Sequence, residues 1–285
     1  MARAHFLTFG DGSPQIRGAA TRLRREALQT GIFDSADAYN LRRLRDEYSV
    51  FWADHGDFLL GAKRGLGYFL WKPFLVSTKL TEIAEDDVLV YADAGCEFMP
   101  DNRRELIDWL PSEPECDLSA VPLDRQHTNG RWTNSCCLAH LDNTDAFLQQ
   151  PILAATFMFL KNTGRSRHLA AKWLEWSGYD DHCCLVDRPG DVERLEFEEH
   201  RHDQSIFSLL AYDLERKGAL HIKRIGIERT LDGSAAIRGL RNKTPFRRGG
   251  SERRWRLFSK SYSLAVKLFW NEQKYRDDLY ESLRK

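Results

Sequence analysis

Several features that would assign a chain of 285 residues to a specialised class are missing from this sequence. No apolar run approaches the ~20 residues that a membrane-spanning helix needs, and the first residues lack the apolar segment of a signal peptide. The six cysteines include two adjacent pairs but no Cys-x-x-Cys spacing, so their pattern predicts neither a zinc site nor a disulfide scaffold. We therefore expect a cytoplasmic protein with reduced thiols.

A net charge is also missing, because 42 Lys and Arg residues balance 42 Asp and Glu residues. The balance hides an asymmetry: residues 241–285 hold 13 basic and 5 acidic side chains, which leaves 29 and 37 for residues 1–240. The basic end suits an anionic membrane surface, an acidic glycan or a nucleic acid, although a charge run is often only a solvated face. The acidic body and the lack of a recognised module argue against nucleic acid.

The apolar runs that are present predict an α/β fold with a mixed sheet flanked by helices. His5–Phe9 is expected to form the first strand, and Ser13 to cap a helix that begins at Pro14. Val88–Tyr91 is a short apolar run typical of a buried strand, and Asp93-Ala94-Gly95 follows it. A carboxylate and a glycine at the carboxyl end of a buried parallel strand lie where open α/β sheets bind ligands.

Other runs extend this prediction along the chain. Further strands are expected over residues 31–39, 117–122, 152–160 and 219–225, and helices over residues 41–51, 102–110, 166–176 and 206–214. Trp52–Asp57 is expected to break the first of these helices. Ser166 is expected to cap the third.

A basic segment precedes the Val88–Tyr91 strand. Trp71-Lys72-Pro73 marks the expected start of a helix, because proline is tolerated in a first helical turn. Arg64 then lies in the loop before it. A helix N-terminus that is exposed beside Arg64 and Lys72 favours a bound anion.

The densest cluster of titratable side chains runs from Glu198 to Ser205. It precedes a helix with apolar periodicity, so Asp203 falls near a helix N-terminus, where the dipole stabilises a carboxylate. Asp203 is therefore either only a helix cap or a site residue. His202 and Gln204 beside it favour a site that stabilises a developing oxocarbenium cation.

Three motifs together resemble bacterial nucleotide-sugar glycosyltransferases of the GT-A fold, which build capsule, lipopolysaccharide and related surface glycans. The motifs are Arg-Gly-x-Gly-Tyr-x-x-Trp-Lys-Pro from Arg64, Tyr-x-Asp-x-Gly from Tyr91, and His-Asp-Gln-Ser from His202. The resemblance covers residues 4–225 and implies a Rossmann-like sheet that binds a nucleoside diphosphate sugar. Asp93-Ala94-Gly95 stands in the place of that fold's Asp-x-Asp motif. Gly95 replaces the second Asp, the carboxylate that most directly holds a divalent cation.

The resemblance also implies a role for individual residues. Those expected to bind the donor are Thr8, Phe9, Gly10, Arg64, Lys72, Asp93, Ala94 and Gly95. Those expected to act at the sugar are Asp203, Gln204 and His202. Those expected at the acceptor are Ala154, Ala155 and Trp132, although core packing explains the two alanines equally well. A divalent cation, Mn²⁺ or Mg²⁺, would bind Asp93 and His221. The outer face of an edge strand would give the same pattern at His221 and Lys223.

The implied function is transfer of a sugar from a nucleoside diphosphate sugar to a glycan or lipid-linked acceptor, in surface polysaccharide synthesis. The alternative is a catalytically inactive nucleotide-sugar-binding protein of the same fold. Residues 1–240 would form the catalytic domain. Residues 241–285 would form a basic, aromatic helical extension that packs on the core or touches the inner membrane surface. The prediction requires Asp93 and Asp203 to converge on one cleft at the carboxyl-terminal rim of the sheet.

Overall fold

The computed structural model describes residues 2–62, 64–142, 144–187, 192–226, 236–239, 241–246, 278–279 and 281–283. The chain divides into two compact units, each assembled from three segments. Unit 1 contains Met1–His5, Gly61–Tyr91 and Asp108–Gly226, and unit 2 contains Phe6–Leu60, Ala92–Ile107 and Ile227–Lys285. Most of the predicted helix in the basic extension lies outside the described residues.

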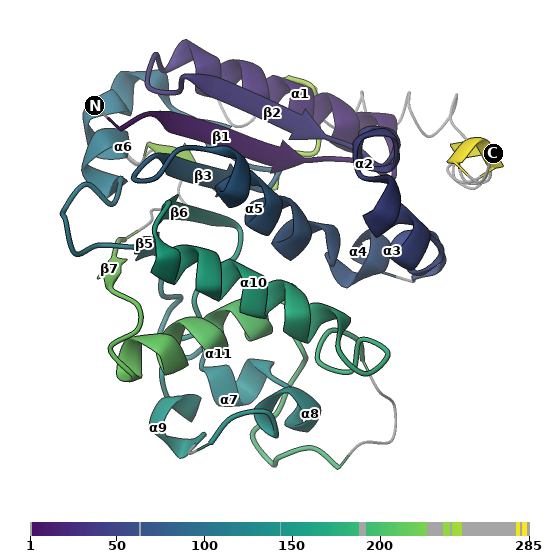
Figure 1. Ribbon diagram of the computed structural model, residues 1–285, viewed down its shortest axis with the longest axis vertical. Coiled ribbons are helices and arrows are strands. Elements are labelled where there is room, and N and C mark those ends of the chain that lie inside the picture. The colour runs from purple at the N-terminus through teal and green to yellow at the C-terminus, as the bar shows by residue number, and fades with distance from the viewer. Residues whose placement is uncertain are drawn as a thin grey trace, which may run out of the picture. The chain divides into compact units, whose positions relative to one another are not determined.

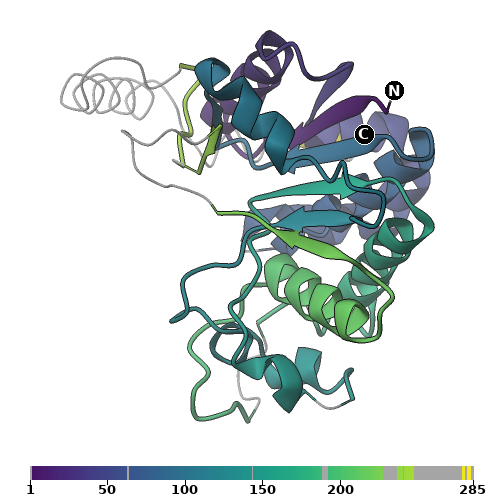
Figure 2. The same cartoon turned by 90° about the vertical axis from the view of Figure 1, so that its left-hand side faces the viewer.

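Six strands form the central sheet, in the order β2-β1-β3-β6-β5-β7. Their bounds are β1 (Ala4–Phe9), β2 (Ser35–Tyr39), β3 (Val88–Ala92), β5 (Leu118–Ala120), β6 (Phe157–Lys161) and β7 (Ile222–Arg224). β5 pairs antiparallel with β6 and parallel with β7, so that Leu118 faces Leu160 on one side and Ile222 on the other. Figure 2 shows β7 beside β5. The prediction of an α/β fold with a mixed sheet flanked by helices is confirmed.

The helices of unit 1 include three long ones that pack together. They are α5 (Trp71–Glu82), α10 (Gly164–Gly178) and α11 (Asp203–Arg216). α10 contacts both α5 and α11, and Figure 1 shows it between them. The fully buried Trp173 of α10 packs its ring 5.0 Å from that of Phe207 in α11.

Other elements, four of them in unit 1, are mostly shorter. They are α4 (Gly65–Tyr68), α7 (Asn129–Trp132), α8 (Ser135–Leu138) and α9 (Asp145–Leu148), with α2 (Leu41–Glu47), α3 (Ser49–Gly61), β4 (Glu97–Phe98), η1 (Pro100–Asn102), α6 (Arg103–Trp109) and β8 (Ile237–Arg238). Among the described helices, none combines the length and the apolar character that a membrane crossing requires.

Local capping signals were predicted well at one helix and wrongly at another. Ser13 accepts a hydrogen bond from the backbone N–H of Ile16 at the start of α1 (Pro14–Gln29), as predicted. At α10 the N-cap is Thr163 rather than Ser166. Thr163 and Ser166 bond reciprocally to each other's backbone N–H groups, as in a capping box, and Ser166 lies inside the helix.

Several predicted boundaries are wrong. The helix predicted over residues 41–51 ends at Glu47, and the strand predicted over residues 31–39 begins at Ser35. Trp52–Asp57 does not break a helix, because α3 continues to Gly61 and buries Phe51 and Leu59 at helical spacing. The predicted strand over 152–160 begins only at Phe157.

Asp87, just before β3, ties the beginnings of two strands together. Its carboxylate accepts hydrogen bonds from the backbone N–H of Arg3 at 2.8 Å and from His5 Nε2 at 3.1 Å. Burial opposes the charge on Asp87, but the hydrogen bonds from Arg3 and His5 outweigh it and lower the pKa of the carboxyl group.

Candidate functional site

Two of the predicted motifs lie against each other in unit 1, the basic one that begins at Arg64 and the acidic one that ends at Ser205. Three side-chain pairs join them, in order from the surface to the core: Arg64–Glu199, Tyr68–His202 and Lys72–Asp203. The outer pair is a hydrogen bond of 2.7 Å, the middle pair has ring centroids 4.9 Å apart, and the inner pair is an ion pair at 2.8 Å. We call these the paired contacts.

The glycines of the basic motif allow the chain to turn sharply before α5. Gly65 and Gly67 have φ angles of 61° and 79°, in the left-handed region that glycine adopts without strain. A Cβ atom at Gly65 would also lie 2.7 Å from the ring of Phe69. The indole N–H of Trp71 closes the turn by donating to the carbonyl of Gly65 at 3.0 Å.

Lys72 is buried, whereas the sequence predicted that it would lie beside an exposed helix N-terminus. The side chains of Lys72 and Asp203 are only 4% and 5% exposed. Lys72 Nζ also donates to the carbonyl of Ala155 at 3.1 Å and lies 5.2 Å from the ring centre of Tyr91. A carboxylate, a carbonyl and aromatic faces can replace water around a buried ammonium group, which explains why the prediction of exposure is wrong. The donor-binding role of Lys72 stays a prediction.

Asp203 is the first residue of α11, and His202 precedes it at the N-cap position. His202 has φ of 55° and makes no capping hydrogen bond with its side chain. The carbonyl of Asp203 accepts a hydrogen bond of 2.9 Å from the indole N–H of Trp173, which fixes the start of the helix against α10. Asp203 is therefore not the helix cap that the sequence suggested as one alternative, and its side chain forms the buried end of the paired contacts.

Backbone hydrogen bonds and the two motifs together hold the segment before β6. The backbone N–H of Ala154 donates to the carbonyl of Val121 at 2.8 Å, and Leu153 forms an isolated antiparallel bridge with Pro122. Gln204 Nε2 donates to the carbonyl of Leu153 at 3.0 Å, and Lys72 Nζ donates to the carbonyl of Ala155. The backbone pairing before β6 takes the form of isolated bridges, and the regular strand begins only at Phe157. Ala154 and Ala155 are both buried, and their predicted role at the acceptor stays a prediction.

Two buried histidines are held by a turn that follows α10. His202 Nδ1–H donates to the carbonyl of Leu185 at 2.8 Å, and Nε2 has no hydrogen-bond partner among the described residues. His200 bonds to the carbonyl of Cys184 at 2.9 Å through Nε2 and accepts from the backbone N–H of Asn134 at 3.3 Å. Burial lowers the pKa of His202, and burial together with His202 lowers the pKa of His200 to about 3. Both rings are neutral near pH 7, so Nε2 of His202 carries a lone pair.

Trp132, predicted at the acceptor, also contacts the acidic motif. Its carbonyl accepts hydrogen bonds from the hydroxyl of Ser205 and from the backbone N–H of Arg201, and the guanidinium of Arg201 lies 4.0 Å from its ring centre. Its indole Nε1 is buried and has no hydrogen-bond partner among the described residues. A buried donor of this kind can bond to the oxygen of a water or a ligand. The acceptor role of Trp132 stays a prediction.

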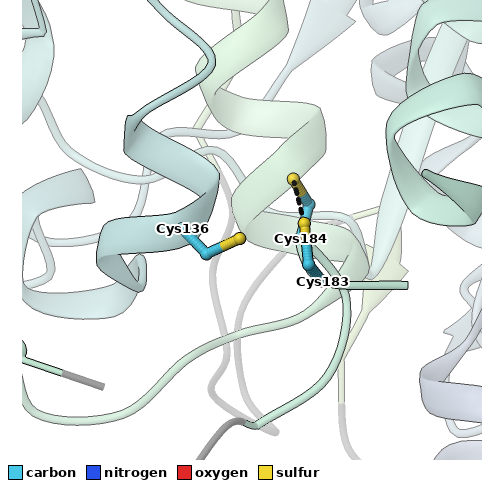
Figure 3. A group of neighbouring side chains, drawn as sticks. All are labelled: Cys136, Cys183 and Cys184. Atoms are coloured by element: carbon cyan, nitrogen blue, oxygen red, sulfur yellow. Dashed lines mark hydrogen bonds between the residues drawn. The ribbon is translucent and has the colours of Figure 1, made fainter. Parts of the chain in front are cut away.

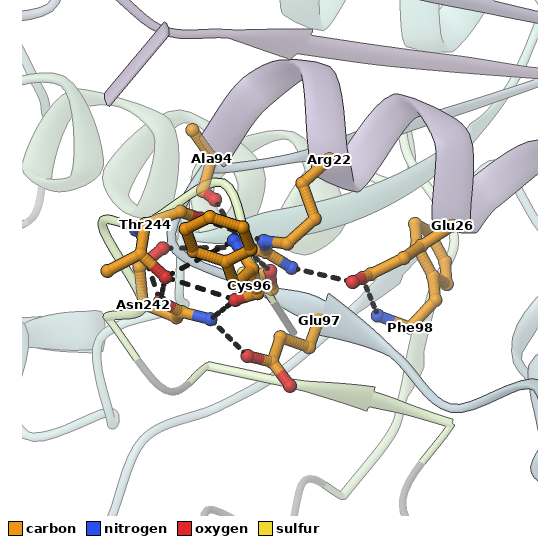
Figure 4. Close-up of polar contacts among 9 residues, drawn as sticks. Arg22, Glu26, Ala94, Cys96, Glu97, Phe98, Asn242 and Thr244 are labelled. Atoms are coloured by element: carbon orange, nitrogen blue, oxygen red, sulfur yellow. Dashed lines mark hydrogen bonds and ion pairs between the residues drawn. The ribbon is translucent and has the colours of Figure 1, made fainter. Parts of the chain in front are cut away.

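Unit 2 contains the other predicted donor residues, and a buried arginine holds the segment around them (Figure 4). Arg22 NH2 donates to the carbonyls of Ala94 at 3.1 Å and Cys96 at 2.9 Å, and its other nitrogens bond to Glu26 at 2.9 Å and the carbonyl of Thr244 at 3.1 Å. The sequence analysis missed Arg22. The signal available was an Arg–Glu pair at i, i+4 among apolar residues of a helix.

Packing explains why a glycine is found at position 95, where the Asp-x-Asp motif would have its second Asp. A Cβ atom at Gly95 would lie 3.0 Å from the Cα atom of Arg241, and the backbone N–H of Asn242 donates to the carbonyl of Gly95 at 2.8 Å. The sequence predicted that Gly95 would admit another backbone or a phosphate. The structure shows a backbone there, and the donor contact of Gly95 stays a prediction.

The first predicted donor segment is buried. Thr8 and Phe9 are 0% and 4% exposed, and a Cβ atom at Gly10 would lie 2.5 Å from the carbonyl oxygen of Ile16. Packing against α1 therefore explains the glycine. Thr8 Oγ1 is buried without a hydrogen-bond partner among the described residues.

The predicted metal ligands, Asp93 and His221, belong to different units. His221 is partly exposed, and its Nδ1 lies 2.9 Å from the carbonyl of Glu115, which can only accept. A carboxylate oxygen and an imidazole nitrogen are ligands that suit Mn²⁺, so the donor types fit such an ion. Joint ligation by Asp93 and His221, and the convergence of Asp93 with Asp203, stay predictions.

No protein-family model and no curated protein sequence matches the chain. Solved structures similar to it include mouse xyloside xylosyltransferase 1 in its apo form, at 12% identity over 79% of this chain and 85% of that chain, with a TM-score of 0.41. The apo-form glycosyltransferase GlyE of Streptococcus pneumoniae TIGR4 matches at 13% identity over 99% of this chain and 64% of that one, with a TM-score of 0.42. Glucosyl-3-phosphoglycerate synthase from Mycobacterium tuberculosis, in complex with Mn²⁺, UDP-glucose and phosphoglyceric acid, matches at 13% identity over 81% and 74%, with a TM-score of 0.38. Similarities this distant carry no argument about the activity of this chain.

Proposed function

We propose that the chain is a glycosyltransferase that moves a sugar from a nucleoside diphosphate sugar to a hydroxyl group of a glycan or lipid-linked acceptor, in surface polysaccharide synthesis. The observation that carries the proposal is the set of paired contacts between the basic and the acidic motif. Each motif was predicted to belong to a site from its own residues. Their direct contact supports one shared site in unit 1.

Arg64 is the residue of this site best placed to bind a donor. Its side chain is 45% exposed, and that of its partner Glu199 is 43% exposed. An exposed ion pair of this kind is weak, so a diphosphate with its greater charge can displace Glu199 from the guanidinium. A divalent cation held by Asp93 and His221 would neutralise charge on the diphosphate.

The transfer breaks the bond between the anomeric carbon and the diphosphate oxygen and forms a bond to the acceptor oxygen, which loses its proton. We assign that proton to Nε2 of His202, because it is a neutral nitrogen with no partner among the described residues. Asp203 would stabilise positive charge on the sugar. Gln204 would position the segment that contains Ala154 and Ala155.

One observation favours the alternative, an inactive protein that binds nucleotide sugars. Asp203 is only 3% exposed and pairs with Lys72, as a purely structural carboxylate would. Activity measurements with binding measurements beside them separate the two functions.

The test uses purified protein and a panel of UDP-, GDP- and CMP-sugars, with and without Mn²⁺. We expect one donor to raise the melting temperature and to release its nucleotide. Arg64→Ala should weaken donor binding about tenfold or more, through loss of a charged hydrogen bond. His202→Asn should lose turnover while the donor still raises the melting temperature, and His168→Asn, on the exposed face of α10, should match wild type.

Three results would contradict these expectations. If no sugar nucleotide raises the melting temperature, both functions are wrong. Binding without turnover in the wild-type protein supports the inactive alternative. Full turnover in His202→Asn removes His202 from the reaction.

A further inference from the structure

The two adjacent cysteine pairs meet in unit 1, close to the acidic motif. The Sγ atoms of Cys136, Cys183 and Cys184 all lie within 4.8 Å of one another (Figure 3). Cys136 is in α8, and Cys183 and Cys184 are in the turn that follows α10. The sequence predicted no zinc site because the spacing within each segment is wrong, but folding brings the two segments together. All three thiols are free of disulfide bonds.

A histidine stands beside the three thiols. His140 Nδ1 lies 2.9 Å from the carbonyl of Cys136, to which its N–H group donates a hydrogen bond. Nε2 then carries the lone pair, and both ring nitrogens lie near Cys184 Sγ, Nδ1 at 3.6 Å and Nε2 at 3.9 Å. Nδ1 is the nearer of the two, so the ring must turn to present Nε2 to the three sulfur atoms before it can bind the same ion.

The distances agree with a tetrahedral zinc site. With Zn–S bonds of about 2.3 Å, two sulfur ligands lie about 3.8 Å apart, and a sulfur and an imidazole nitrogen lie about 3.6 Å apart. Cys183 Sγ and Cys184 Sγ are 3.8 Å apart, which matches the expected sulfur–sulfur distance. Three thiolates and one imidazole form a common donor set of closed, structural zinc sites.

A disulfide fits this cluster less well. A single disulfide would use two of the three neighbouring thiols and leave the third beside it.

We propose that Cys136, Cys183, Cys184 and His140 bind a structural zinc ion. The ion fixes the turn whose carbonyls hold the two buried histidines, since Cys184 bonds to His200 and Leu185 bonds to His202. It also joins this turn to α8, next to Asn134, whose backbone N–H donates to His200. The zinc ion is therefore a positioning element for the acidic motif and does not contact a substrate.

The experiment measures the zinc content of the purified full chain and its variants by mass spectrometry, so it does not depend on any activity. We expect about one zinc per chain, as four protein ligands imply. Cys136→Ser and Cys184→Ser should lose it, and Cys116→Ser should keep it. Cys116 is the matched control because it is a buried cysteine of unit 1 whose thiol donates to the carbonyl of Leu118 instead.

Two measurements on the wild-type protein keep the test valid if a variant fails to fold. Replacement of zinc by Co²⁺ should give thiolate-to-cobalt charge-transfer bands and the strong visible bands of a tetrahedral ion. A chelator should raise the number of cysteines that react with a thiol reagent by at least three and should lower the melting temperature.

Absence of zinc from folded protein, octahedral cobalt bands, or zinc that survives in Cys184→Ser overturns the proposal. A protein mass that is lower by two hydrogens, with no metal, also overturns it in favour of a disulfide. Unchanged zinc affinity in His140→Gln overturns the assignment of the fourth ligand.

Discussion

The buried ion pair between Lys72 and Asp203 makes a quantitative prediction about stability. Removing one partner of a buried pair costs about 3–5 kcal/mol, because an uncompensated charge is left behind. The low end applies to Asp203→Asn, since Lys72 keeps the carbonyl of Ala155 and the nearby aromatic rings. The high end applies to Lys72→Met, since it leaves a carboxylate that is only 5% exposed without its cation.

The double variant Lys72→Met/Asp203→Asn should be more stable than the sum of the two losses predicts. We expect a coupling of at least about 1 kcal/mol, because the second change removes the charge that the first one stranded. Urea unfolding followed by tryptophan fluorescence gives the four free energies of unfolding. Lys161→Met is the matched control, because its partner Asp86 is 66% exposed and the pair should contribute less than about 1 kcal/mol.

The reasoning would be refuted if each single variant lost less than about 1 kcal/mol and the losses were additive within about 0.5 kcal/mol. That result would mean that the pair is open to water. It would also remove the main support for a shared site of the two motifs.

Three further predictions concern stability and use the same urea assay. Arg22→Lys should cost about 3–5 kcal/mol of stability, because lysine lacks the planar guanidinium that donates to several carbonyls at once. A loss below about 1 kcal/mol would contradict the described network. Gly95→Ala should cost about 1–3 kcal/mol through overpacking, whereas Gly61→Ala, with no atom within 4 Å of its Cβ position, should change stability little; equal effects would show that position 95 is open. The pKa of Asp87 is lower in the folded protein than its unfolded value of about 3.8, so its carboxylate stabilises the fold above that value. This stabilisation is lost as the pH falls through the folded pKa, and Asp87→Asn should therefore cost less stability at about pH 3 than at about pH 6. An equal cost at the two pH values would contradict this prediction.

Elements that depend on neighbours in sequence were predicted most accurately. Ser13 with Pro14 specifies the start of α1, and the apolar run Val88–Tyr91 specifies β3, because capping and strand burial are local signals. The start of α5 at Trp71 followed in the same way from Pro73.

Features that depend on distant partners were not predicted. Lys72 carries no sign in its own segment that Asp203 will bury it, so only the fold reveals the ion pair. The cluster of cysteines around Cys184 was not predicted for the same reason, since neither of its two segments has a metal-binding spacing of its own. Arg22 looked like one more arginine on a basic helix, although it is almost completely buried. In each case a buried polar group found its partner through tertiary structure.

The network around Arg22 reaches across the boundary that composition suggests at residue 240. Its guanidinium donates to the carbonyls of Asn242 at 3.3 Å and Thr244 at 3.1 Å, both in the segment with the basic excess. A protein truncated after residue 240 would leave the buried Nε–H group of Arg22 without its acceptor and would remove one of the three carbonyls around its NH2 group, so its melting temperature should drop. Trimming the basic end to improve solubility or crystallisation would therefore damage the folded body, and the last described residues matter as well, because Leu279 and Leu283 are buried and the carbonyl of Ser282 accepts a hydrogen bond from Arg45.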